Sequence, residues 1–207
     1  MKFHNPMVVQ SFSLQRGVTF TLNSCLGTQD DPGVENIVTD LLVLGEMANC
    51  RLPAVEALDA KLGGKVAAAL ADVNFTGQAG ESVLVKVNDP AASQKYILVI
   101  GLGDIVHYNG RSVCGFTRKV LEVAKELGVE KISIPFFPNR QTEEKVCLAA
   151  TAATMVCRVT MFIPSLPNLK EIEIISTPQA RRHLQDGLFG RTPRCIICTN
   201  PELGHQS

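Results

Sequence analysis

A glycine-rich segment follows an apolar run near the middle of the chain, at residues 101–104 (GLGD). Glycines allow backbone amides to converge on a phosphate, because no side chain keeps them apart. A dinucleotide-binding fingerprint also requires a third glycine that opens a helix directly, whereas the expected helix begins only after residues 107–110 (HYNG). The pattern therefore favours a tight strand exit over a dinucleotide site.

Two cysteines near the C-terminus, Cys195 and Cys198, have the CxxC spacing at which two thiolates bind one metal ion, and His205 could provide a third ligand. A structural zinc site requires a fourth ligand and a second pair at regular spacing, and neither is visible in the sequence. A redox pair would open a helix early in a thioredoxin-like unit, whereas this pair lies near the end of the chain. We interpret both cysteines as incidental thiols, with metal binding and redox chemistry as the alternatives, and assign no metal site.

The other reactive side chains have structural interpretations. Cys147 and Cys157 lie about 15 Å apart along one expected helix, so they cannot form a disulfide with each other and are expected to pack in the core. A basic cluster at residues 181–183 (RRH), with Arg191 and Arg194 beyond it, indicates a solvated helix face, or else a site for an anion or acidic partner. The sequence pairs no nucleophile with a base, so no catalytic residue is assigned.

The elements that would position these groups alternate between strands and helices over the last two thirds of the chain. A short apolar run at 39–45 (TDLLVLG) predicts a strand buried on both faces. Apolar residues spaced by three and four predict one long helix over 52–70, and we expect its Gly63 and Gly64 at a bend or a close backbone contact. The other predicted strands span 7–12, 18–22, 82–87, 96–100, 131–136 and 171–175, and the other predicted helices span 111–127, 143–161 and a final helix started by Thr177-Pro178.

This order predicts an α/β fold with a mixed, largely parallel sheet that carries helices on both faces. We find no internal repeat and no low-complexity linker. Residues 1–190 are therefore expected to form a single domain with an N-terminal β extension, and residues 191–207 a C-terminal tail.

The composition excludes several classes of protein. The chain has 207 residues, of which 45% are apolar and 19% charged, with 20 Lys+Arg against 20 Asp+Glu. Neither intrinsic disorder nor a broad basic surface for nucleic acid is expected from this balance. We find no signal peptide and no run of about 18 apolar residues that would span a membrane. The odd count of seven cysteines indicates free thiols, so we expect a cytoplasmic protein.

Three segments resemble the N-terminal domain of the leucyl aminopeptidase family (peptidase family M17). They are 58–87 (LDAKLGGKVAAALADVNFTGQAGESVLVKV), 95–104 (KYILVIGLGD) and 120–137 (VLEVAKELGVEKISIPFF). The family domain likewise has a helix, a glycine-bearing turn, a strand and a second strand that ends in Gly-Leu-Gly. That domain is similar in fold to macro domains, the modules that bind ADP-ribose, so the resemblance implies a macro-domain-like three-layer sandwich.

The resemblance also implies where peptidase chemistry would lie. In the family it belongs to a separate C-terminal domain, in which a Lys, several Asp and a Glu hold two metal ions around an Asn-Thr-Asp-Ala-Glu-Gly-Arg motif. The 207 residues contain no version of that motif, and we expect the catalytic domain to be absent. Peptidase activity and a cofactor are therefore not expected, because nothing would activate water without the metal pair.

The ligand motifs of macro domains are altered in this sequence. Active macro domains carry an Asp after the first strand, an Asn-rich loop and a Gly-rich phosphate loop, and the matching positions here are Asn23, 44–50 (LGEMANC) and 135–145 (PFFPNRQTEEK). The last segment contains no Gly, and Glu46 would repel phosphate if it faced the pocket.

We expect any ligand cleft to lie between the 101–104 and 135–140 segments, where Phe136 and Phe137 either leave it open or fill it. The candidate ligand-binding residues at this cleft are Gly101, Gly103, Asp104, Asn139 and Arg140.

Three hypotheses for function follow. The leading one is a stand-alone, non-catalytic domain that acts by binding or assembly, with a second copy or another protein as its partner. The alternative is a degenerate macro-like module that binds ADP-ribose or another nucleotide at the carboxyl ends of its strands. A hydrolase of ADP-ribose conjugates is the third. None of them involves nucleic acid or a membrane.

Overall fold

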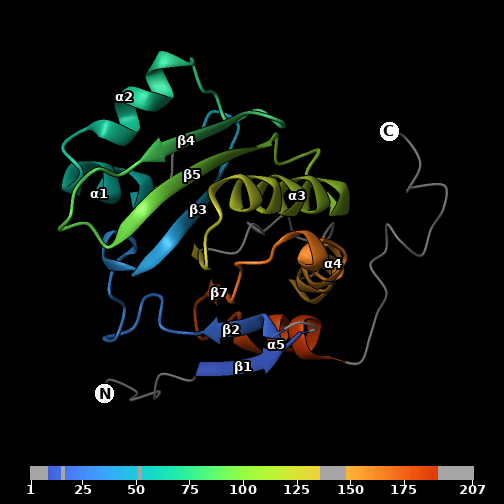
Figure 1. Ribbon diagram of the computed structural model, residues 1–207. Helices are drawn as coiled ribbons and strands as arrows, with labels where there is room; N and C mark the ends of the chain where they lie inside the picture. The colour runs from blue at the N-terminus through green and yellow to red at the C-terminus, as the bar shows by residue number, and fades with distance from the viewer. Residues whose placement is uncertain (1–8, 15–16, 51–52, 136–147, 191–207) are drawn as a thin grey trace, which may run out of the picture.

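The computed structural model describes residues 9–14, 17–50, 53–135 and 148–190. The strands in these ranges are β1 (Val9–Ser13), β2 (Thr19–Asn23), β3 (Thr39–Met47), β4 (Ser82–Lys86), β5 (Gln94–Gly103), β6 (Lys131–Pro135) and β7 (Glu171–Ile175). They form one sheet in the order β1-β2-β7-β6-β3-β5-β4 (Figure 1). β2, β7, β6, β3 and β5 are parallel, whereas the edge strands β1 and β4 are antiparallel to their neighbours.

Helices cover both faces of the sheet, as Figure 1 shows. On one face lie α3 (Gly110–Leu127), α4 (Leu148–Phe162) and α5 (Arg181–Phe189), and on the other lie α1 (Pro53–Lys61), α2 (Lys65–Asp72) and a short 3-10 helix (Val34–Asn36). Alternate residues of β3 separate the two cores, because successive side chains of a strand point to opposite faces. Leu41 and Val43 pack with α3, and Leu42 and Leu44 pack with α1 and α2. The predicted α/β class, with a largely parallel sheet between two helical layers, is confirmed.

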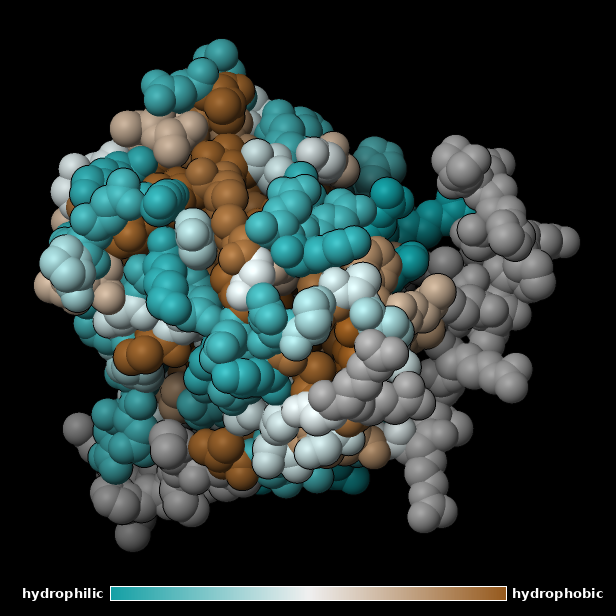
Figure 2. All heavy atoms as spheres, viewed as in Figure 1, coloured by the Kyte–Doolittle hydropathy of each residue, from teal (hydrophilic) through white to brown (hydrophobic). Residues whose placement is uncertain are grey.

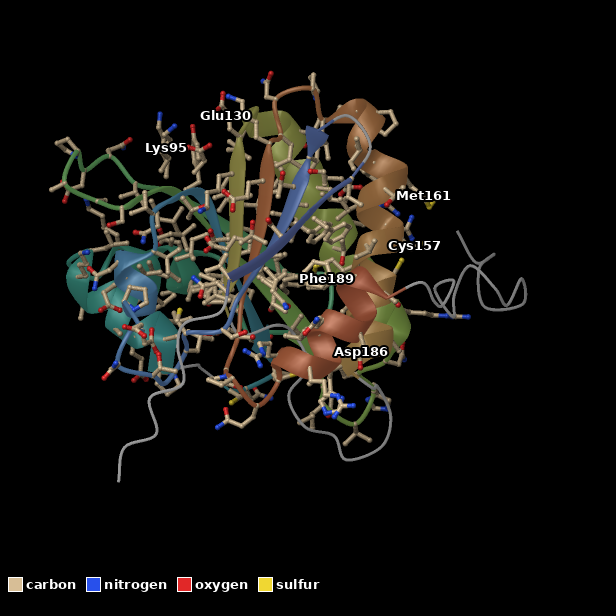
Figure 3. The ribbon with its side chains drawn as sticks, turned by 90° about the horizontal axis from the view of Figure 1, so that it is seen from below. Lys95, Glu130, Cys157, Met161, Asp186 and Phe189 are labelled. Atoms are coloured by element: carbon tan, nitrogen blue, oxygen red, sulfur yellow. The ribbon has the colours of Figure 1, made fainter. Side chains whose placement is uncertain are left out.

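Strand β1 is attached to the α5 side of the sheet by aromatic contacts. The Phe12 ring stacks on Phe20 of β2 with centroids 5.6 Å apart, and it meets Phe189 of α5 edge-on at 4.8 Å. Figure 3, which views the molecule from below, shows Phe189 at the end of α5 where that helix crosses the sheet. Edge-to-face and offset ring pairs stabilise a fold by more than their buried area alone would, so this cluster anchors the edge strand.

The prediction of one long helix over 52–70 is wrong, because the structure has two helices there, α1 and α2. Gly63 and Gly64 lie between them with φ values of 64° and 84°, the left-handed conformation that ends a helix. The Asp59 carboxylate then accepts hydrogen bonds from the Val66 and Ala67 amides, each at 2.8 Å, and so satisfies the first turn of α2. Of the two alternatives stated for the glycines, the bend is the one observed.

The last helix begins later than predicted. Thr177 and Pro178 form a turn, in which the Ala180 amide donates to the Thr177 carbonyl at 3.2 Å, and α5 starts at Arg181. The predicted helix over 111–127 and the strand over 171–175 are confirmed, with Asn109 and Gly128 as the caps of α3.

Among the described residues, one segment is long and apolar enough to cross a membrane, although it is not an unbroken apolar run. It spans Leu148–Ser165, that is α4 and the 3-10 turn after it, and qualifies by length and composition alone. In the fold this helix packs against both α3 and α5, and Thr151, Ala152 and Met155 are buried in those contacts. This buried face accounts for part of the apolar character, since 39% of the segment is buried in the fold.

Two helical glycines in different surroundings allow a matched test of this packing. A Cβ at Gly187 of α5 would collide with the Ala149 carbonyl oxygen and lie 2.7 Å from the Ala152 Cβ on α4. A Cβ at Gly115 of α3 would have no atom within 4 Å. We expect Gly187→Ala to lower the free energy of unfolding by about 1–3 kcal/mol, and Gly115→Ala to raise it by about 0.5–1 kcal/mol through helix propensity. Urea unfolding of both variants measures this, and equal effects would contradict the close crossing of α4 and α5.

Candidate ligand-binding site

The Gly101 and Gly103 amides at the end of β5 are already used in backbone hydrogen bonds. Gly101 donates to the Glu81 carbonyl and Gly103 to the Gly77 carbonyl, each at 2.9 Å. A side chain at Gly101 would collide with the Gln78 backbone, so this glycine permits a close approach of two chain segments. These two amides are therefore not free to converge on a phosphate.

The turn that approaches Gly101 is held by the Glu81 carboxylate. It accepts hydrogen bonds from the Thr76 and Gln78 amides at 2.9 and 3.0 Å, and from the Thr76 hydroxyl at 3.1 Å. The hydrogen bond from the Thr76 amide lowers the pKa of Glu81 below its ordinary value. Asp104 lies just beyond β5, where its exposed carboxylate accepts from the Val106 amide at 2.9 Å.

The other half of the predicted cleft lies outside the described residues. That half comprises Asn139 and Arg140, with Phe136 and Phe137 beside them. The structure thus places Gly101, Gly103 and Asp104 around one strand exit, and the assignment of the five residues to a common cleft stays a prediction.

The segment 44–50, matched by position to a macro-domain loop, is mostly strand. Leu44 to Met47 belong to β3, and only then does the chain turn, with Asn49 in the left-handed conformation at φ 56°. Glu46 is buried, with 3% of its surface exposed, and strand alternation places it on the α1 and α2 side together with Leu42 and Leu44.

Two buried polar atoms without hydrogen-bond partners lie where β2 ends. They are Oδ1 of Asn23 and Oγ of Ser24. The Asn23 amide group donates to Glu173 Oε1 of β7 at 3.5 Å, and Ser24 is 5% exposed. The carboxyl ends of the five parallel strands meet at this edge, where open α/β sheets place their ligands. Buried polar atoms usually have partners, so this pair is unusual.

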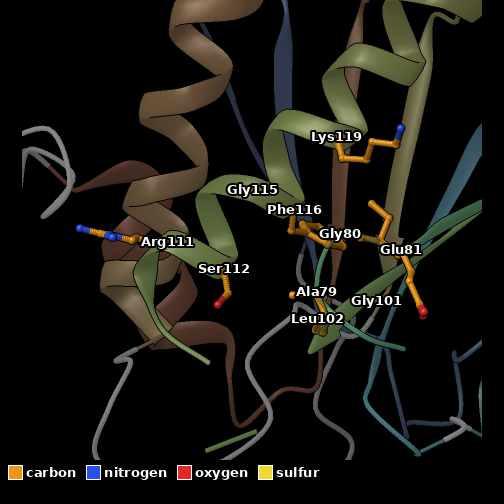
Figure 4. Close-up of a pocket in the computed structure, with 11 residues that line it drawn as sticks. Ala79, Gly80, Glu81, Gly101, Leu102, Arg111, Ser112, Gly115, Phe116 and Lys119 are labelled. Atoms are coloured by element: carbon orange, nitrogen blue, oxygen red, sulfur yellow. The ribbon is translucent and has the colours of Figure 1, made fainter. Parts of the chain in front are cut away.

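A cavity of about 360 Å³ lies between the end of β5 and the first half of α3. We call it the edge cavity, because it also borders the start of edge strand β4. Figure 4 shows the residues that line it, among them Ile100, Gly101, Leu102, Gly115, Phe116 and Lys119. Of the three predicted site residues that the structure describes, Gly101 lines it and Gly103 and Asp104 do not. Sequence reasoning missed the α3 residues, for which a glycine inside a strongly amphipathic helix was the available signal.

Most of the predicted cysteine and basic groups cannot be placed in either region. Cys195, Cys198, His205, Cys147, Arg191 and Arg194 lie outside the described residues. Cys25 and Cys114 are buried, and burial raises the pKa of the Cys25 thiol. Cys157 is half-buried rather than in the core, and Figure 3 shows it on the outer side of α4. Within the described part of the chain, no three His, Cys, Asp or Glu side chains gather as a metal-binding group.

Comparison with known proteins connects this geometry to one family. The N-terminal domain of the cytosol aminopeptidase family matches residues 43–161. The rice chloroplastic leucine aminopeptidase 2 is 31% identical over 112 residues, which is 54% of this chain and 18% of that protein. A mutant of tomato leucine aminopeptidase has a TM-score of 0.60 at 17% identity, over 86% of this chain and 36% of the other. The chain thus spans well under half of these relatives.

Macrodomains share the fold over most of this chain. The Oceanobacillus iheyensis macrodomain with ADP has a TM-score of 0.66 at 13% identity, and the match covers 89% of this chain and 97% of that one. The Trypanosoma brucei macrodomain in complex with ADP has a TM-score of 0.63 at 14% identity, over 82% and 68% of the two chains. At these identities the likeness shows the macrodomain-like three-layer fold.

The packing of the Gly101 segment can be tested by one substitution. In Gly101→Ala the new methyl group would force the Gln78 backbone away and disturb the hydrogen bonds at the end of β5. We expect the free energy of unfolding to fall by about 1–3 kcal/mol, measured by urea unfolding, with Gly115→Ala as the control. A Gly101→Ala protein as stable as the control would show that the segment yields easily, and that its glycine serves another purpose.

Proposed function

The chain belongs to the cytosol aminopeptidase family, whose N-terminal domain it carries, and from this premise we propose that it acts by binding or assembly and does not hydrolyse peptides. The resemblance assigns the metal-binding peptidase residues to a different domain, and the 207 residues contain no Asn-Thr-Asp-Ala-Glu-Gly-Arg segment. A hydrolytic site of this family would need a metal pair to activate water. These points support a non-catalytic role for this chain.

The observation that carries the binding role is the pair of unpartnered polar atoms at the end of β2. A buried oxygen without a hydrogen bond costs about 1–3 kcal/mol, so a ligand group that bonded to Asn23 Oδ1 or Ser24 Oγ would recover part of that cost. The atoms lie at the edge where parallel α/β sheets bind ligands. This position supports a binding site built on β2 and β7.

A nucleotide is the second candidate ligand, favoured by the fold. Two macrodomains that share it contain ADP. The Gly101 and Gly103 amides are committed to backbone carbonyls, so a diphosphate here would require other donors. Binding of a nucleotide would therefore rely on residues at the carboxyl ends of β2 and β7 more than on those at the carboxyl end of β5.

We expect no turnover of aminoacyl chromogenic substrates by the purified chain, with or without added Zn²⁺ or Mn²⁺, because the proposed role needs no metal pair. The assay is an absorbance time course at several metal concentrations, and light scattering on the same sample measures the oligomeric state that an assembly role requires. Metal-dependent hydrolysis that copurifies with the chain would overturn the proposal.

Calorimetric titration with ADP-ribose tests the nucleotide candidate. We expect measurable binding, weakened about five- to tenfold in Asn23→Ala, because one hydrogen-bonding side chain at the strand end is lost. Thr19→Ala is the matched control, since Thr19 begins the same strand on the same face, far from its carboxyl end. No heat and no thermal shift at millimolar ADP-ribose would rule out this candidate and leave the assembly role to be tested separately.

A further inference from the structure

A glycine of α3, Gly115, lines the edge cavity near the end of β5. A Cβ at Gly115 would meet nothing within 4 Å, so the absent side chain leaves open space against the sheet. Its volume of about 360 Å³ corresponds to about a dozen water molecules, enough for a small organic molecule. A glycine inside a helix destabilises it relative to alanine, so the space is maintained at a cost in stability.

The floor of the edge cavity is apolar. Ile100, Leu102 and Phe116 belong to the buried core on this side of the sheet and expose part of that core at the cavity. Figure 2 shows hydrophobic side chains gathered on this face of the molecule over β4 and β5, beside α3. One of the exposed residues of β4 is Leu84, at 43%. The floor therefore suits an apolar ligand body.

Two cationic residues, Lys119 and Arg111, line the edge cavity. Lys119 is half-buried, lines the cavity, and has no hydrogen-bond or ion-pair partner among the described residues. In Figure 4 its side chain extends from α3 toward the strand side, whereas the Arg111 guanidinium points away. An ammonium group that lies over apolar surface without a partner favours an anion at that position.

A carboxylate at the edge cavity disfavours a ligand with two negative charges. Glu81 also lines the cavity, but its carboxylate is bound to the Thr76 and Gln78 amides and points away from α3 in Figure 4. This fixed negative charge at the border of the cavity disfavours a dianion such as a phosphate monoester. We propose that the edge cavity binds a small amphipathic monocarboxylate, with its apolar body on Ile100, Leu102 and Phe116 and its carboxylate on Lys119.

This site is separate from the carboxyl ends of β2 and β7. The test of ligand binding in the edge cavity is therefore independent of the proposed function. The test is an NMR titration of the ¹⁵N-labelled chain with 3-phenylpropionate and, as the neutral match, 3-phenylpropionamide. We expect saturable shifts of the Gly101 and Gly115 amide signals with the acid, and binding about fivefold weaker with the amide.

Two variants locate the ligand. Gly115→Leu fills the space from an open helix position, so it should stay folded and weaken binding of both probes about tenfold or more. Lys119→Gln should remove the preference for the acid while the amide binds as before. Lys125→Gln, the same charge change on an exposed turn of α3, is the control and should change neither affinity.

Three results would overturn the proposal. The first is no saturable shift at Gly101 or Gly115 with millimolar acid. The second is equal affinity for acid and amide in the unmodified chain, which would remove Lys119 from recognition. The third is unchanged binding in a folded Gly115→Leu protein, which would place the probe elsewhere. Thermal unfolding of each variant confirms that it is folded before the titration.

Discussion

The architecture depends on β3, the strand that is buried on both faces in the middle of the sheet. It pairs with β5 on one side and β6 on the other, and its alternate residues supply both hydrophobic cores. At its start, the Asp40 carboxylate accepts from the Glu130 and Lys131 amides at 2.8 and 3.0 Å and pairs with Lys95 at 2.7 Å. Burial alone would raise the pKa of Asp40, but these bonds outweigh it and lower the pKa. Figure 3 shows Lys95 and Glu130 at the same end of the molecule.

At the opposite ends of β3 and β5, neighbouring backbone segments are packed closely together. There the Ala48 amide donates to the Gly103 carbonyl and the Asn49 amide to the Thr76 carbonyl, both at 2.9 Å. Three chain segments thus meet with backbone against backbone, which explains why glycines occupy 77, 101 and 103. A segment with the composition of a phosphate loop has become a packing junction, because its donors are used within the fold.

Two regions flank that junction, and they differ in chemistry. The region at the ends of β2 and β7 is polar, and in it the buried Asn23 and Ser24 oxygens lack hydrogen-bond partners. The region beside α3 is apolar with one lysine above it. Among the described residues neither region brings together a nucleophile and a base, and binding is the role that we propose for each. The family to which the chain belongs and its macrodomain-like fold are consistent with such a role.

Local patterns determined much of this protein. Apolar runs and spacings of three and four residues identified the strands and most helices, and the segments around Gly-Leu-Gly identified the family, because side-chain periodicity and close glycine turns are encoded over a few residues. The split at Gly63 and Gly64 was decided by backbone conformation, since the same apolar stripe fits one helix or two. Only the tertiary structure decided three features. They are the hydrogen bonds of the Gly101 and Gly103 amides, the unpartnered Asn23 oxygen and the edge cavity at Gly115. Each depends on the distance between segments far apart in the chain, and no local pattern contains that distance.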